Sequence, residues 1–394
     1  MKRSLIILIL LLGLNINNVY ATNIENKEND LSNDMIVKQL ENINMIPLEE
    51  LIKSINNDNS DYFPKINFKK MIISLIKGEA SFTLKDLLNG LLKMIFKETV
   101  ANSSLLAKLI VLSIICAFLH NLSNAFASES VGKLAYTACY LVIVAIAIKS
   151  FSIATSIGID AIDEMISFMQ ALLPILLTLL MSMGAVTSTA IFQPVIVASV
   201  SVVSTLMQNI ILPMIFFSVI LSIVNNLSSK IHISKLASLL KQTCIILIGF
   251  ILTIFTGIIT IQGLTASTAD GITIRTAKFA VDRFIPVVGG FVSDAFDTIL
   301  GCSLLIKNAV GALGIILLII IIAMPLLKIL TLIFIYKMTA AIIEPITENQ
   351  LVNCLNDMSN AMVLILGTVI SVAIMFFFTV TIIVGAGNIT LMMR

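Results

Sequence analysis

Apolar residues dominate the chain from Leu105 onward, where they form long runs separated by short polar turns. Each run is about twenty residues or longer, which is enough to cross the hydrocarbon core of a bilayer as a helix. The clearest runs cover residues 105–123, 134–157, 165–187, 243–263, 309–335 and 361–386. A further run, Ile191–Val224, contains Pro194 and Pro213 and is either one kinked helix or a tight hairpin of two. The pattern predicts an all-α polytopic integral membrane domain over residues 104–394, with six to eight transmembrane helices.

The first residues have the pattern of a secretory signal, residues 1–21. Lys2 and Arg3 precede the short apolar run Leu5–Leu14, and Ala21 completes a small-residue cleavage site. We expect the mature chain to begin near Thr22. An uncleaved anchor is the alternative, and either arrangement places the next segment outside the cytoplasm.

Residues 22–103 are predicted to be a small helical extracytoplasmic region with an acidic tether followed by basic amphipathic helices. Pro47 is expected near a helix start, and apolar stripes follow at helical spacing, for example Phe68, Ile72 and Leu75. Two interpretations stay open. The helices either lie on an anionic lipid surface or pack together as a small domain.

Composition supports a membrane class. Hydrophobic residues make up 58% of the chain and charged residues 12%, about half the usual charge of a soluble domain. The mean hydropathy is +1.04. A net charge of +2 gives no reason to expect a nucleic-acid partner, so lipid is the expected environment. The five scattered cysteines are expected to be buried small hydrophobes.

The sequence contains no recognisable catalytic or cofactor motif. A Walker A loop, HExxH and GxSxG are absent, and His120 and His232 lie far apart at the edges of apolar runs. We therefore expect no enzyme activity, no cofactor and no metal site. Any transport by this chain would need a partner or a gradient to drive it.

Charge gives a partial orientation. Lys230, Lys235 and Lys241 cluster in one loop that fits the cytoplasm. Asp160, Asp163 and Glu164 are expected to form an acidic loop on the outer side. With residues 22–103 outside, this scheme requires the run 191–224 to cross twice as a hairpin. The stretch Gly263–Gly314 then falls on the outer side.

This stretch is too polar to span a bilayer and too apolar for a plain loop, and it organises the rest of the chain. Residues 264–308 are predicted to form a re-entrant or amphipathic helical hairpin, with charges on one face of each helix and a break near Pro286. The candidate functional surface is Arg275, Lys278, Asp282, Arg283, Pro286, Gly289, Gly290, Asp294 and Asp297. The alternative is an amphipathic hairpin exposed at the interface without a specific role.

The run TADGITIRTAKFAVDRFIPVVGGFVSDAFDTILGCSLLIKNAVG resembles the stage III sporulation protein AE family of endospore-forming bacteria. The resemblance extends over essentially the whole chain and is most specific between Thr265 and Gly311. It implies a multi-pass subunit in the mother-cell membrane around the forespore. The implied partners are the other membrane proteins of the stage III operon, a secretion-type ATPase and the forespore protein Q.

These features bear on three possible functions. A subunit of a transenvelope channel, or feeding tube, between mother cell and forespore explains the many spans, the outward N-terminal region and the missing energy source. A self-contained secondary transporter or permease is the alternative, but it predicts internal repeats and carboxylates at mid-membrane, and the spans hold almost no acids. A membrane-embedded enzyme is disfavoured because no catalytic constellation is evident.

Overall fold

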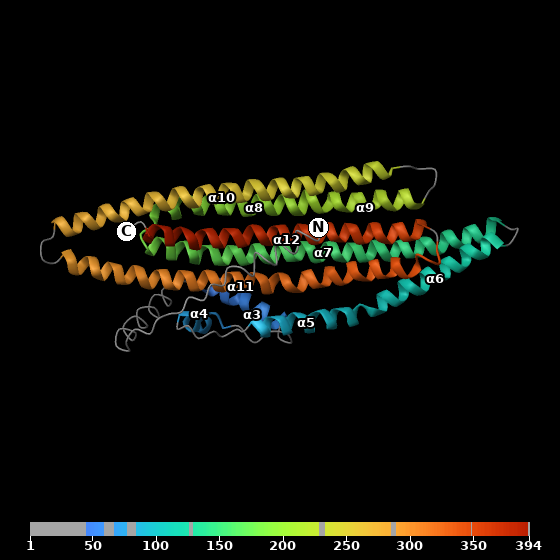
Figure 1. Cartoon of the computed structure of the whole chain (residues 1–394), viewed down its shortest axis with the longest axis horizontal. Helices are drawn as coiled ribbons and strands as arrows, with labels where there is room; N and C mark the ends of the chain where they lie inside the picture. Colours follow the sequence, from blue (N-terminus) through green and yellow to red (C-terminus); the bar gives the residue numbers. More distant parts are fainter. Residues whose placement is uncertain are drawn as a thin grey trace.

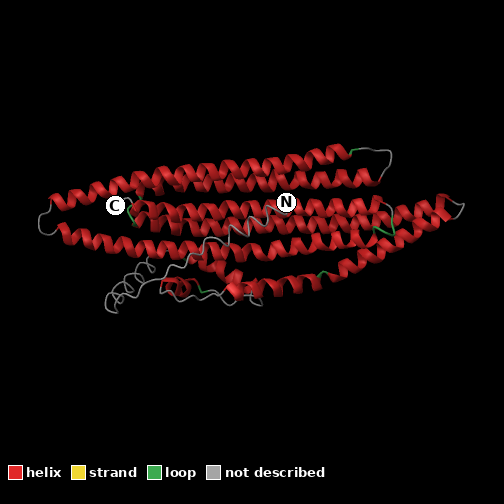
Figure 2. Cartoon of the chain, viewed as in Figure 1, coloured by secondary structure: helices red, strands yellow, loops and turns green. Residues whose placement is uncertain are grey.

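The computed structural model describes residues 45–58, 67–76, 84–125, 129–227, 233–284, 289–347 and 349–392. Over these ranges the protein is α-helical and contains no strand (Figure 2). The short N-terminal helices are α3 (Ile46–Asp58), α4 (Phe68–Ile76) and α5 (Leu84–Ala101). The others are α6 (Ser103–Ala125), α7 (Glu129–Ser182), α8 (Val186–Leu206), the π-helical segment η1 (Met207–Ile211), α9 (Leu212–Leu227), α10 (Ser234–Phe284), α11 (Gly289–Ile343) and α12 (Asn349–Met392).

The long helices run side by side as an elongated antiparallel bundle (Figure 1). Helix α12 lies at its centre and packs on α7, α9, α10 and α11. Helix α10 lies at the edge of the bundle, and only 17% of its most apolar stretch is buried. The last residues of α6, α9 and α11 lie at one end, called here the lysine end. The α7–α8 turn, the last residues of α10, the first residues of α11 and the end of α12 lie at the other, called here the hairpin end.

Among the described residues, five helices are long and apolar enough to cross a membrane, by length and composition. A sixth candidate is the pair Lys93–Ala101 and Ser103–Leu119, which is bent by 44°. The all-α polytopic class is therefore confirmed. The five or six candidate spans agree with the expected six to eight only at the lower limit. The number is lower because two of the predicted turns between spans are absent.

The first absent separation is the acidic loop at residues 160–164. Residues 134–157 and 165–187 were expected to be two spans, but α7 is one helix of 54 residues through both. Gly158 lies within this continuous helix. A Cβ atom at this position would lie 2.9 Å from Ile365 Cγ2 of α12. A glycine so close to a neighbouring side chain permits tight packing of α7 on α12. The acidic residues are instead exposed on the side of a continuous helix.

The second is the favoured hairpin at 191–224. Helices α8 and α9 are joined end to end through η1, so this run is one long helix. Pro213 has no N–H to bond the carbonyl of Asn209, which disturbs the α-helical ladder at that point. The π-helical turn over Met207–Ile211 adjusts the backbone immediately before it. Two prolines thus change the helix locally without reversing the chain.

The stretch 264–308 forms a helical hairpin whose arms are continuous with the long helices. Helix α10 ends at Phe284 and α11 begins at Gly289, and these two helix ends lie on either side of the break expected near Pro286. Residues 285–288 lie outside the described residues. The two arms are therefore extensions of α10 and α11 and not separate short helices between spans.

Helices α3, α4 and α5 lie along the bundle, with α3 on α7 and both α4 and α5 on α11. Leu48, Ile52, Phe68 and Ile72 are buried, as their helical spacing predicted. Part of each stripe of α3 and α4 is thus buried, whereas Leu75 of α4 and Ile95 of α5 are exposed. The predicted signal and the acidic tether up to residue 44 lie outside the described residues.

Candidate functional site

The candidate surface extends past the end of the bundle. Asp270 of α10 contacts the first turn of α8, and Lys307 of α11 contacts the last turns of α12. These two contacts mark the level at which the bundle ends. The parts beyond these contacts, residues 271–299, are called here the distal hairpin. Figure 1 shows both arms extending past α7, α8 and α12 and converging at the tip.

The structure places the predicted site residues in this distal hairpin to different extents. Arg275 is exposed on α10 and Asp297 is partly buried on α11. Gly289 and Gly290 are the first residues of α11. Pro286 lies outside the described residues. For the remaining candidates the helix is described and the side chains are not: Lys278, Asp282, Arg283 and Asp294.

Two large apolar side chains accompany Arg275 on the exposed side of this arm. Ile272 is 62% exposed and Phe279 is 66% exposed. Positions i, i+3 and i+7 share one face of a helix, so the distal part of α10 presents a mixed apolar and cationic face. Exposed aromatic and aliphatic groups beside a charge are typical of a surface that contacts another protein.

At the base of the α10 arm, Asp270 caps the N-terminus of α8. The turn before α8 passes through Gly184, whose φ is 81°, and the N-cap residue Ala185 has no side chain that could accept a hydrogen bond. Asp270 substitutes for that cap. The backbone N–H of Thr187 donates to its Oδ1 at 2.9 Å, and the N–H of Ser188 donates to Oδ2 at 2.8 Å.

This carboxylate is only 1% exposed, and both of its oxygens accept a bond from α8. The N-terminus of a helix carries a partial positive charge and unpaired N–H donors, so it stabilises a buried anion. Asp270 therefore fixes the base of the α10 arm to the start of α8. We infer no ion-binding role for it, because its acceptor oxygens are already used.

At the base of the α11 arm, Lys307 is fully buried. Its Nζ donates to the backbone carbonyl of Val384 at 2.7 Å and lies 3.5 Å from Oδ1 of Asn388, both on α12. Gly387 makes this approach possible, since a Cβ atom there would overlap Nζ. Lys307 thus fixes the base of the α11 arm to the last turns of α12.

Sequence reasoning missed both basal contacts. Asp270 and Lys307 stand just outside the charge pattern that defined the candidate surface, and their partners are far away in sequence. One signal was present: the N-cap residue of α8, Ala185, has no side chain that could cap the helix, which implies a cap from elsewhere. The partner of Lys307 is a backbone carbonyl, which leaves no trace in the sequence.

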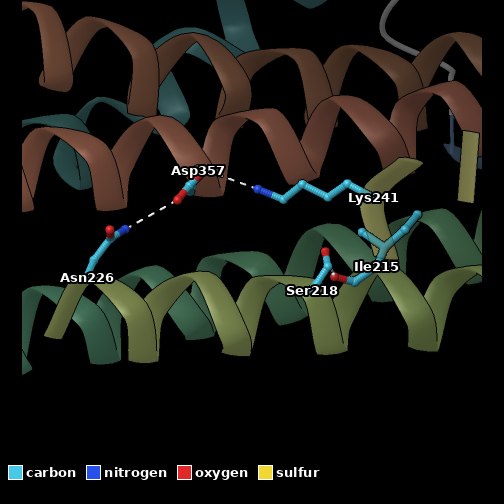
Figure 3. A network of polar contacts seen from close by, with 5 residues as sticks. All are labelled: Ile215, Ser218, Asn226, Lys241 and Asp357. Atoms are coloured by element: carbon cyan, nitrogen blue, oxygen red, sulfur yellow. Dashed lines mark hydrogen bonds and ion pairs between the residues drawn. The ribbon is translucent and has the colours of Figure 1, made fainter. Parts of the chain in front are cut away.

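A third polar group ties helices together near the lysine end (Figure 3). Lys241 Nζ of α10 lies 3.1 Å from Oδ1 of Asp357 of α12. Asn226 of α9 donates from Nδ2 to the other oxygen of Asp357 at 3.3 Å. Nearby, the N–H of Ile233 donates to Oδ1 of Asn225, which closes the α9–α10 turn. These side chains are partly exposed, so the ion pair contributes modestly to stability and mainly fixes the register of three helices.

These contacts define the class of the molecule. Several polar groups in and beside its apolar helices bond one another or the backbone, as interhelical ties do in membrane bundles. Within the described residues, no group of three or more His, Cys, Asp or Glu side chains could hold a metal ion. The protein is a polytopic all-α membrane protein with fixed helix ends and a projecting charged hairpin.

Comparison with known proteins identifies the family. The family model for stage III sporulation protein AE matches residues 66–387. The curated stage III sporulation protein AE of Bacillus subtilis (strain 168) is 43% identical over 326 residues, which cover 83% of this chain and 82% of that protein. The chain belongs to the stage III sporulation protein AE family. No solved structure matches it.

The Asp270 contact gives a first prediction. Asp270→Ala should leave the Thr187 and Ser188 N–H groups without acceptors and lower the free energy of unfolding by about 1–3 kcal/mol. Asp270→Asn should lie between wild type and alanine, because one acceptor oxygen remains. Thermal unfolding in detergent measures this effect, and a cysteine at Val186 should become more reactive when the first turn of α8 frays.

The matched control is Arg275→Ala, an exposed change on the same arm, which should leave the unfolding midpoint unchanged. If Asp270→Ala were as stable as Arg275→Ala, the cap would contribute nothing measurable.

The Lys307 contact gives a second prediction. Gly387→Ala should displace the ammonium from the Val384 carbonyl and destabilise the protein by about 1–3 kcal/mol. The control is Gly385→Ala, because a Cβ at Gly385 meets nothing within 4 Å. Where a helical position has room for a Cβ atom, alanine is neutral or stabilising relative to glycine.

Adding Lys307→Met to Gly387→Ala should recover part of the loss, since the methionine chain is flexible and carries no charge. Strictly additive effects of the two substitutions, measured by the same unfolding assay, would contradict a direct contact between these positions.

Proposed function

We propose that this protein is a membrane subunit of the channel complex, or feeding tube, that connects the mother cell with the forespore during endospore development. The observation that carries the proposal is the distal hairpin, which extends beyond the bundle and presents Ile272, Arg275 and Phe279 to its surroundings. Membership of a sporulation family supplies the biological context. In this proposal the hairpin docks another subunit of the complex.

The two basal contacts support a docking role. Asp270 and Lys307 attach the arms of the hairpin to α8 and α12 at the level where the bundle ends. A projecting element that is fixed at its base presents its surface at a defined angle, and a partner then binds with a smaller loss of conformational entropy. A hairpin that only floated at the lipid surface would not need two buried charges at its base.

Charge and helix direction support the orientation that we propose. Lys235 and Lys241 lie near the α9–α10 turn, at the end of the bundle opposite the hairpin. The positive-inside rule places that lysine end in the cytoplasm, so the distal hairpin and the end of α12 lie outside. Because α7 and the run α8–η1–α9 are each continuous, each has one membrane crossing fewer than predicted. Losing two crossings leaves both ends of the chain on the same sides as before, so the orientation is unchanged.

In the cell, the protein would lie in the mother-cell membrane around the forespore, with residues 22–103 and the distal hairpin in the space between the two membranes. Its partners would be the other membrane proteins of the stage III operon, a secretion-type ATPase that supplies energy, and the forespore protein Q. No enzyme activity is proposed for this chain.

Orientation provides a third prediction. A cysteine at Thr276, which is exposed on the distal hairpin, should react with a membrane-impermeant maleimide in intact cells. A cysteine at Ser234, beside the lysines, should react only after permeabilisation. A reporter fused after Asn388 should read outside. The reverse pattern for the two cysteines would place the hairpin in the cytoplasm and contradict the proposed contact in the intermembrane space.

Docking provides a fourth prediction. Asp294→Lys together with Asp297→Lys, or Arg275→Glu alone, should weaken co-purification with the stage III membrane proteins about ten-fold or more and stop forespore development. Protein level and membrane insertion should stay normal, because these changes lie beyond the basal contacts.

The matched control is Glu344→Lys, an exposed change at the lysine end, which should retain both complex formation and spores. Normal spores from the Asp294→Lys/Asp297→Lys and Arg275→Glu variants would exclude the hairpin as a docking surface. A self-contained permease would instead show transport in vesicles reconstituted without partners.

A further inference from the structure

A cavity of about 530 Å³ opens on the side of the bundle between α3, α7 and α11. Volumes of this size are typical of sites for small organic ligands. The cavity lies far along α7 and α11 from the distal hairpin, and neither the docking proposal nor the helix ties use it. Its lining has three chemically different parts.

The first part is anionic. Asp160, Asp163 and Glu164 line the cavity from α7, and their spacing of three and four residues places them on one face of that helix. Gln208 of the π-helical segment donates from Nε2 to Oδ1 of Asp163 at 2.7 Å, which orients this carboxylate. Three acids in one turn create a negative potential that attracts a cation.

The second part is supplied by α11. Lys328 lines the same cavity and provides a positive charge. Pro325 and Ile321 line it as well. Because proline has no N–H, the carbonyl of Ile321 lacks its usual helical donor and is available to another hydrogen-bond donor. The cavity thus offers acceptors for an ammonium group and a cation for an anionic group.

The third part is apolar. Phe168 of α7, Met324 of α11 and Leu51 of α3 complete the wall. A ligand that matches all three parts carries a hydrogen-bonding cation, an anion close to it and a hydrocarbon chain. Burying hydrocarbon against such a wall is favourable in proportion to the area removed from water.

The level of the cavity along the bundle selects the kind of ligand. At about 1.5 Å per residue, Asp160 lies about 33 Å from the end of α7 at Ser182. Lys328 lies about 31 Å from the buried Lys307 in the same direction along α11. In the opposite direction, Asp160 lies about 39 Å from Leu134, where the apolar part of α7 begins.

A hydrocarbon core of about 30 Å therefore fits on either side of the acidic residues, and a core centred on them would bury three exposed carboxylates at great cost. With the lysine end in the cytoplasm and residues 22–103 outside, the core lies on the lysine side of the acidic residues, and the cavity, which α3 also lines, lies at the level of the outer headgroups.

We propose that this cavity binds an ethanolamine phospholipid. The primary ammonium donates to the Asp160 and Asp163 carboxylates and to the Ile321 carbonyl. The phosphate pairs with Lys328, and the first part of the acyl chains lies against Phe168, Met324 and Leu51. A choline headgroup has the same charge but no N–H donor, and a glycerol headgroup has no cation, so both should bind more weakly.

The experiment uses the full-length protein, purified in a mild detergent and incubated with equal amounts of phosphatidylethanolamine, phosphatidylcholine and phosphatidylglycerol. Native mass spectrometry then counts the retained lipids. We expect phosphatidylethanolamine to be retained about ten-fold or more over phosphatidylcholine. Asp160→Asn with Asp163→Asn should abolish this preference, and Lys328→Met should reduce the retention of phosphatidylethanolamine, because the phosphate loses its partner.

Glu344→Gln is the control, an exposed acid away from the cavity that should change nothing. The variants' thermal unfolding shows that any lost retention does not reflect unfolding. Equal retention of the ethanolamine and choline lipids, or an unchanged preference in the double aspartate variant, would overturn the proposal. Binding of free phosphoethanolamine as tightly as the phospholipid would also overturn it, since the acyl chains would then contribute nothing and the site would recognise a soluble headgroup.

Discussion

Backbone hydrogen bonding in a medium without water is the constraint on which this structure depends. An unpaired N–H or carbonyl group in hydrocarbon costs several kcal/mol, so the chain keeps its helices continuous even where the sequence suggests a break. Helix α7 passes through three acidic residues, and α8 continues into α9 through a π-helical turn before Pro213. The few backbone groups that the helices leave unpaired become the places where distant side chains or ligands are needed.

One of these places, together with a second contact to a carbonyl within α12, organises the hairpin end. The N-terminus of α8 has free N–H groups and no local cap, and Asp270 provides acceptors from another helix. Near the last turns of α12, Lys307 donates to the Val384 carbonyl. One buried anion therefore lies at the positive end of α8, which is the favourable arrangement for its helix dipole. The buried cation bonds a carbonyl within α12. At the lysine end, Asp357 is paired with Lys241 in a more exposed setting, where solvent weakens the ion pair.

Sequence reasoning reached the class of the protein and the position of its unusual hairpin, because both depend on local features. Apolar runs of bilayer length predict helical spans, and the break near Pro286 follows from the backbone geometry of proline. It placed a loop at residues 160–164 because three acids between apolar runs suggest a membrane surface. The predicted position of these acids at the membrane surface agrees with the cavity that we assign to lipid headgroups. The predicted turn at residues 160–164 was wrong, because acids on an exposed helix face do not end a helix. Asp270 and Lys307 could not be assigned, because their partners are backbone groups 82 and 77 residues away.

The basal contacts of Asp270 and Lys307 also divide α10 and α11 into a part that serves stability and a part that we propose for docking. Residues before Asp270 and after Lys307 belong to a packed bundle, where substitutions act on stability through cavities or unpaired groups. Residues 271–299 extend beyond that bundle, and their described side chains Ile272, Arg275 and Phe279 are largely exposed. Exchanges of surface charge there change the free energy of unfolding by little, while a charge exchange in an interface changes partner affinity strongly. Stability and docking can therefore change independently in this protein, and a hairpin anchored by two buried charges keeps its position while its surface residues vary.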